Sequence, residues 1–197
     1  MSSVMTHDPP DAPLRGRTES ALSKDKAAGA GLRRGPGKTL VIGLGNPIVS
    51  DDSVGLRVVE QLRPLLEDRQ GVDVVEDYWG GLRLMEQMIG YRRAVVIDAT
   101  YTGAAPGTIH HLSTDSIATQ KSASAHDVNL PTALAFGRQA GAALPADEDV
   151  HLIGIEAEDL VNFNEQCTPA VAAAIPRAVQ EVIRLLDCPT PEGEKPK

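Results

Sequence analysis

Short apolar runs alternate with longer stretches of helical periodicity between residues 38 and 187. An apolar run bounded by turn residues is typical of a strand that is covered on both faces, as in a parallel sheet. The pattern predicts four such strands, at Thr39–Gly43, Val72–Asp77, Ala94–Asp98 and Val150–Ile155, and an edge strand at Thr108–Leu112.

Helices are predicted between these strands, where apolar residues recur every three or four positions, as Val54, Val58 and Leu62 do. Pro131 is tolerated in a first turn. Thr168 is a good N-cap residue with proline after it, and Pro176 should kink the helix that follows. The expected helices cover residues 52–66, 81–89, 129–140 and 168–186.

Strands that alternate with helices indicate an α/β fold. Parallel neighbours joined by right-handed crossovers give one twisted, mostly parallel, five-stranded sheet with helices on both faces, of the phosphorylase/hydrolase-like kind. We expect a single domain at residues 38–187, because residues 1–37 and 188–197 are rich in Pro, Gly and charge without periodicity and predict a disordered leader and tail.

Composition narrows the function. The formal net charge of -8 argues against nucleic acid as a partner and suits a basic peptide or a metal cation. Cys167 and Cys188 make neither a disulfide framework nor a zinc site. No apolar run approaches the roughly 20 residues that span a bilayer, and no secretory signal is evident. We therefore expect a cytoplasmic protein without a membrane partner.

In a parallel sheet, sites form beyond the carboxyl ends of the strands. After the first strand comes Gly43-Leu44-Gly45-Asn46-Pro47, and Ile48 stands where a dinucleotide fingerprint needs glycine. Two acids follow, Asp51 and Asp52. One of them could cap the following helix, which would leave the other available for chemistry.

Asp98 ends the third strand, and His126 precedes a later helix. Asp98 could simply be a hydrogen-bonded cap at the strand end, and His126 could be an ordinary surface histidine. Together with Asp52, however, they would place two carboxylates and an imidazole at one rim. That donor set suits a divalent transition metal that retains open positions. Cys167, beside a predicted N-cap, is more simply structural than reactive.

The ordered motifs resemble the NiFe-hydrogenase maturation endopeptidases. The similarity includes Gly43-x-Gly45-Asn46 followed by Asp51-Asp52-x-x-Gly55-x-Arg57, and Val96-Ile97-Asp98-Ala99 with Pro106-Gly107-Thr108. It continues with Ser124-Ala125-His126-Asp127, and with Thr168-Pro169-Ala170-Val171 and the helix that follows. It extends from about Thr39 to Leu186.

The resemblance implies that Asp52, Asp98 and His126 contact metal, with Asp52 and Asp98 also catalytic. It implies a substrate, the NiFe-hydrogenase large-subunit precursor, whose own nickel is recognised before a C-terminal extension is removed. Another divalent metal could occupy the isolated protein. The chemistry would be metal-assisted hydrolysis, in which a carboxylate orients or deprotonates water.

Two departures from the family pattern stand out. Well-known members have glutamate at the position of Asp52, and many have Asp-Gly-Gly-Thr where this chain has Asp77-Tyr78-Trp79-Gly80-Gly81. We expect Asp77, Trp79, Gly80 and Gly81, together with Asn46, to contact the substrate. Trp79 is equally compatible with a place in the core.

Two alternatives remain from the residues. Peptidyl-tRNA hydrolase also opens with a strand and Gly-Leu-Gly-Asn-Pro, but its tyrosine and histidine-asparagine pair are replaced here by Ser50-Asp51-Asp52, and the chain is acidic. A chaperone that senses nickel and binds the hydrogenase precursor without cutting it would use the same three side chains.

Overall fold

A five-stranded sheet forms the centre of the protein. The computed structural model describes residues 35, 37–114 and 129–188. Its strands are β1 (Thr39–Leu44), β2 (Val72–Asp77), β3 (Arg93–Thr100), β4 (Ile109–Leu112) and β5 (Val150–Glu156). They lie in the order β2-β1-β3-β5-β4, parallel except that β4 runs antiparallel to β5 at one edge. The predicted architecture and the edge position of β4 are confirmed.

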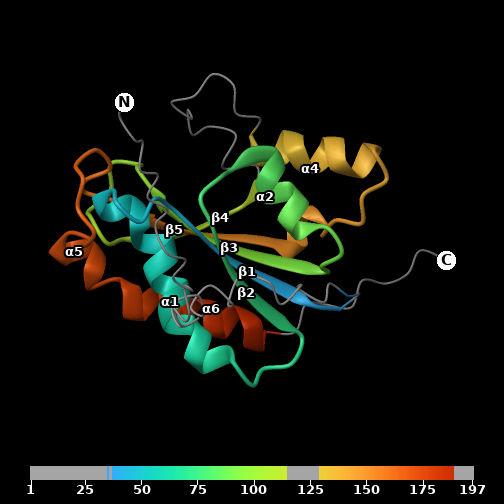
Figure 1. Cartoon of the computed structure of the whole chain (residues 1–197), viewed down its shortest axis with the longest axis horizontal. Coiled ribbons are helices and arrows are strands. Elements are labelled where there is room, and N and C mark those ends of the chain that lie inside the picture. Colours follow the sequence, from blue (N-terminus) through green and yellow to red (C-terminus); the bar gives the residue numbers. More distant parts are fainter. Residues whose placement is uncertain (1–34, 36, 115–128, 189–197) are drawn as a thin grey trace, which may run out of the picture. The chain divides into compact units, whose positions relative to one another are not determined.

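Helices cover both faces of this sheet (Figure 1). The layer on one face contains α1 (Val54–Leu66) and α6 (Ile175–Asp187), and the other face carries α2 (Gly81–Met88) and α4 (Leu130–Gln139). Shorter elements are η1 (Ser50–Ser53), η2 (Asp147–Asp149) and α5 (Pro169–Ala172). Among the described residues, no helix has the length and apolar character needed to cross a membrane.

Side chains of each strand alternate between two cores. In β3, Val95 and Ile97 pack in the core beneath α1 and α6, whereas Ala94 and Val96 pack in the core beneath α2 and α4. Because both faces are covered, the central strands are apolar at nearly every position, which is the pattern seen in the sequence. Burying one such aliphatic side chain contributes roughly 1.5–3 kcal/mol.

The C-terminal helix differs from its prediction. It is two helices, α5 and α6, rather than one kinked helix, and Pro176 lies in the first turn of α6. Proline has no amide hydrogen for the preceding turn, so the chain ends one helix and starts another. Thr168 stands at the N-cap position of α5, yet its side chain makes no cap hydrogen bond and is used elsewhere.

The first helix also begins differently. The predicted helix from Asp52 starts as the tight turn η1 and becomes α-helical only at Val54. By contrast, Asn129 caps α4 by accepting the Thr132 amide at 3.0 Å, and Pro131 follows in the first turn, as predicted.

Three predicted segments fall wholly or largely outside the described residues. They are the disordered leader (1–37), the disordered tail (188–197) and the segment that carries His126. Those predictions stay predictions. All described residues belong to one unit of the chain, Arg33–Lys197.

Candidate functional site

The loop between β1 and η1 fixes one carboxylate at the sheet edge. The Asn46 amide donates to Oδ2 of Asp52 at 2.8 Å. Gly45 has a φ of 143°, and a side chain there would collide with the Asp52 carbonyl. The glycine therefore allows the loop to fold back onto Asp52. Asn46 was predicted to contact substrate; in the structure its amide holds Asp52 in place.

Asp51, the neighbouring acid, is fully buried. Its Oδ2 accepts the amides of Glu158 and Asp159, both at 2.9 Å, and its two oxygens also accept the amide and hydroxyl of Thr168. The expectation that one of the two acids caps the helix is wrong, because neither makes a cap hydrogen bond. Successive side chains of a 3₁₀ turn point about 120° apart. Asp51 therefore points to the loop after β5, and Asp52 points to the loop after β1.

Asp98, near the end of β3, is the second carboxylate of the candidate site. Its Oδ1 accepts the Ala99 amide at 2.8 Å. Burial, and then the negative charge of Asp52, raise the pKa of Asp98 to about 7. The two predicted residues lie at the same part of the sheet edge, because Gly55, three residues after Asp52, packs against the carbonyl of Ile97, the residue before Asp98.

Glycine packing explains their approach. Gly55, in the first turn of α1, lies against β1 and β3, and a Cβ there would collide with the carbonyl oxygens of Leu44 and Ile97. The start of α1 therefore touches the backbones of both strands. Asp52 lies three residues before Gly55, and Asp98 directly follows Ile97. The close packing of Gly55 against Ile97 therefore brings Asp52 near Asp98.

The pKa of Asp52 is also raised, mainly by burial, and the Asn46 amide offsets part of that rise. Raised pKa values show that the charged forms of both carboxyl groups are disfavoured, and a bound cation would relieve the repulsion between them. This is the electrostatic state expected of a reactive or metal-binding site rather than of a structural ion pair.

A metal ion would need a further ligand. Among residues 37–114 and 129–188, no three His, Cys, Asp or Glu side chains gather with a geometry that could hold a metal. Asp52 and Asp98 supply two oxygen donors, and their chemistry fits a divalent cation. His126, the predicted third ligand, lies outside the described residues.

The loop after β2 is a separate part of the same edge, since Asp77 pairs in register with Leu44 of β1. Asp77 is buried: its Oδ1 accepts the Tyr78 and Trp79 amides, and its Oδ2 accepts the Gln87 side chain. Its carboxylate thus shapes the loop from within. Trp79 is 62% exposed, which resolves its two readings in favour of the surface.

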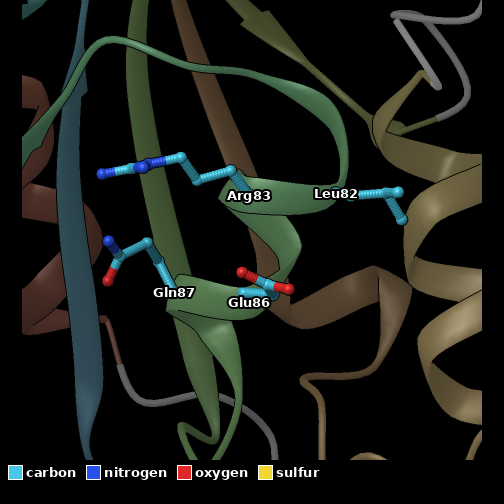
Figure 2. A pocket seen from close by; sticks show the side chains of 4 residues that line it. All are labelled: Leu82, Arg83, Glu86 and Gln87. Carbon is cyan, nitrogen blue, oxygen red and sulfur yellow. The ribbon is translucent and has the colours of Figure 1, made fainter.

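Gly80 and Gly81 connect this loop to α2. Gly81 has a φ of 60°, a conformation that glycine adopts without strain. Beyond them, one face of α2 lines a pocket of about 440 Å³ (Figure 2). Arg83 and Gln87 project to the same side of the helix in that view, away from Leu82, and Arg83 also pairs with Asp77 at 3.3 Å.

One buried acid at the carboxyl edge of the sheet was not predicted from the sequence. Glu156, the last residue of β5, is 0% exposed. It accepts the amides of Thr102, Gly103 and Ala104, the Thr102 hydroxyl, and His110 at 3.1 Å. Burial raises its pKa, but these hydrogen bonds outweigh burial and lower the pKa overall. Its position at a strand end was the available signal.

Cys167 lies beside the N-terminus of α5, where a helix could activate a thiol. Burial instead raises the pKa of Cys167, and its sulfur lies 3.5 Å from the Ser53 hydroxyl. Both observations favour the structural role that was expected over a reactive thiol.

Comparison with known proteins gives consistent matches. The profile of the HycI family, described as hydrogenase maturation protease, matches residues 56–185. The chain is 28% identical to the hydrogenase expression/formation protein HupD of Rhizobium leguminosarum bv. viciae, over 76% of this chain and 74% of that protein. It is also 28% identical to the hydrogenase 2 maturation protease of Escherichia coli, over 76% and 90% of the two chains.

A solved structure matches as well. The hydrogenase maturating endopeptidase HybD from E. coli superposes with a TM-score of 0.62 at 27% sequence identity, covering 76% of this chain and 91% of that one.

Proposed function

Because the chain belongs to the hydrogenase maturation protease family, we propose that it is an endopeptidase that removes the C-terminal extension of a nickel-loaded NiFe-hydrogenase large-subunit precursor. The observation that carries this proposal is the approach of Asp52 to Asp98 at the carboxyl edge of β1 and β3, where Gly55 packs against the backbones of both strands. Membership of this family, rather than that of peptidyl-tRNA hydrolase, accounts for the Gly-Leu-Gly-Asn-Pro loop. The protein works in the cytoplasm, where the precursor matures.

The nickel belongs to the substrate. Asp52, Asp98 and His126 contact it when the precursor docks, and another divalent cation takes its place in the isolated protein. The bound cation supplies polarisation of the scissile carbonyl. The loop with Asn46 and the loop with Asp77, Trp79, Gly80 and Gly81 contact the polypeptide around the cut.

The two carboxylates divide the proton handling. Oδ1 of Asp98 accepts the Ala99 amide, which leaves Oδ2 as the oxygen available for proton exchange. As the free carboxylate, Asp98 would accept a proton from the attacking water and return it to the departing amine. Asp52 is held by the Asn46 amide, and its charge raises the proton affinity of Asp98.

The test is the intact mass of the nickel-loaded precursor before and after incubation with the protein. Wild-type protein should shorten the precursor by one C-terminal peptide, and Asp52→Ala, Asp98→Ala and His126→Ala should not. Asp68→Ala is the matched control, because Asp68 is an exposed acid just beyond the C-terminal end of α1.

Each outcome separates the alternatives. An unchanged mass with wild-type protein that still binds the precursor would identify the nickel-sensing chaperone instead. Full cleavage by all three site variants would remove the proposed site. A nickel-free precursor should remain uncut, and its cleavage would contradict recognition of the metal.

A further inference from the structure

The loop between β5 and α5 exposes apolar side chains to solvent. Val161 and Phe163 are each 82% exposed, and Leu160 is exposed beside them. Ile48, in the loop after β1, is 51% exposed. We call these four residues the apolar patch. Single exposed apolar residues need no explanation, whereas a group of them marks an interaction site.

Backbone hydrogen bonds hold the patch together. Val49 and Phe163 form an isolated antiparallel bridge, and the Asn164 amide donates to the Ile48 carbonyl at 3.1 Å. Within the loop, Oδ1 of Asp159 accepts the amides of Val161 and Asn162 at 3.0 and 3.1 Å. The side chains are thus presented outward by a built loop, which lowers the entropy cost of docking a partner.

The charge around the patch is negative. Residues 158–166 contain three acids, Glu158, Asp159 and Glu165, and no lysine or arginine. Arg57 is a nearby cation, but it donates to the Glu165 carbonyl at 2.6 Å and to Glu60 at 3.5 Å. Hydrogen bonds from Asn162 and Val161 lower the pKa of Asp159, which keeps it charged. The partner that complements the patch in both polarity and charge is an apolar segment that carries lysine or arginine.

The patch is joined to the candidate active site. Asp51 accepts the Glu158 and Asp159 amides, and its own amide donates to the Asp159 carbonyl at 3.0 Å. Asp52 is the next residue. Figure 1 shows the loop after β5 and the segment after β1 on the same side of the sheet, at the carboxyl ends of the strands.

From these observations we propose that the apolar patch and its acids dock an apolar, basic segment of the protein substrate. Asp51, the residue before Asp52, anchors the loop that carries the patch. The inference rests on the proposed function, because it takes the occupant to be the polypeptide that is cleaved. Docking holds the substrate beside the two carboxylates, and the loop after β2 remains available to contact it elsewhere.

The experiment measures both binding and cleavage of the nickel-loaded precursor by full-length protein. Phe163→Ser and Val161→Ser should each weaken binding and raise KM about 10-fold or more, with kcat within about twofold of wild type. Phe136→Ser is the matched control, since Phe136 is 59% exposed on α4 and should leave both quantities unchanged. Thermal unfolding should be unchanged in all three, because the replaced side chains face solvent.

Variants with reversed charge test whether the docked segment is basic. Glu158→Lys and Glu165→Lys should weaken binding several-fold, and salt should weaken binding of the wild type more than that of these variants. Unchanged binding by the Phe163, Val161 and glutamate variants would overturn the docking inference while cleavage by wild type leaves the proposed function standing.

The remaining outcomes are also decisive. Wild-type protein that binds but does not cut would overturn the proposed function alone, and the variants would still test docking through binding. Absence of both binding and cutting would overturn both. Loss of self-association by Phe163→Ser in sedimentation, with precursor binding intact, would assign the patch to a second copy of this chain and overturn the inference.

Discussion

Asp98 and Glu156 stand at the carboxyl ends of neighbouring strands, yet their surroundings differ. Among the described residues, Asp98 has one backbone donor, and its pKa is raised to about 7, whereas Glu156 has five donors and a lowered pKa. Burial alone disfavours both charges. Hydrogen bonds decide which carboxylate is fixed as an anion and which remains able to exchange a proton.

The comparison separates a structural acid from a reactive one at the same edge. Both carboxylate oxygens of Glu156 accept hydrogen bonds, from the turn at Thr102–Ala104 and from His110. Within the part of the chain that the structure describes, Asp98 accepts one backbone amide and experiences the negative charge of Asp52. Replacing each acid by its amide should therefore affect different properties.

The largest expected effect is on catalysis. Asp98→Asn should lower the rate of precursor cleavage by about 10³-fold, because an amide cannot accept the proton of the attacking water. The rate is measured in single-turnover reactions at saturating protein. Glu156→Gln, measured at a temperature where it remains folded, should lose far less. Equal losses for the two variants would erase the distinction between the two acids.

The next effect is on stability. Glu156→Gln should lower the free energy of unfolding by about 3 kcal/mol, because the amide nitrogen meets backbone donors and leaves them unsatisfied. Denaturant titration at pH 7 measures this change. Asp98→Asn in the same titration should be as stable as wild type or more so. A Glu156→Gln protein of wild-type stability would show that the turn does not depend on the carboxylate.

The pH dependence of stability should have opposite signs for the two acids. Because folding raises the pKa of Asp98, its contribution is present at low pH and is lost as pH rises from about 4 to about 7. The loss is about 2 kcal/mol after allowance for the side chain's contact with solvent. In metal-free buffer, Asp98→Asn should abolish this fall.

Because folding lowers the pKa of Glu156, its contribution is present above the unfolded value of about 4.5 and is lost as pH falls through the folded pKa. Glu156→Gln should flatten the acid limb of the stability curve and leave the limb between pH 4 and 7 unchanged. Unfolding measured at intervals across pH 3–8 distinguishes the two. Flattening of the same limb by both variants would contradict the assignment.

The smallest effect concerns His110. His110→Phe should cost about 1 kcal/mol of stability, since one of five hydrogen bonds to Glu156 is lost while ring volume is kept. His111→Phe is the matched control, because His111 is 56% exposed and pairs with Glu181 at 3.5 Å. Equal effects of the two substitutions would show that the contact with Glu156 contributes nothing.

Much of the fold was predictable, because buried parallel strands leave continuous apolar runs. The same rule located Asp52 and Asp98, since parallel strands bring their carboxyl ends to one edge. The roles of Asp51 and Glu156 were not predictable. Their partners lie 107–117 and 46–54 residues away, and local pattern carries no information about such contacts.

The break before Pro176 and the exposed loop after β5 illustrate the same limit. A proline at that position is compatible with a kink or with a new helix, and the structure has a new helix that begins at Ile175. The apolar residues at 160–163 resemble a core segment in the sequence. In the structure, Phe163 forms a bridge with Val49, and the apolar side chains of this segment are exposed to solvent. The role of His126 stays a prediction.

The central claim is that Asp52 and Asp98 share one desolvated site at the edge of the sheet. Its most direct test is a ¹³C NMR titration of the Asp98 carboxyl group in metal-free protein, with and without Asp52→Asn. If the two acids share one site, Asp98 titrates with a pKa of about 7 that falls when the Asp52 charge is removed. A pKa near the ordinary value of 3.8, unaffected by Asp52→Asn, would contradict it.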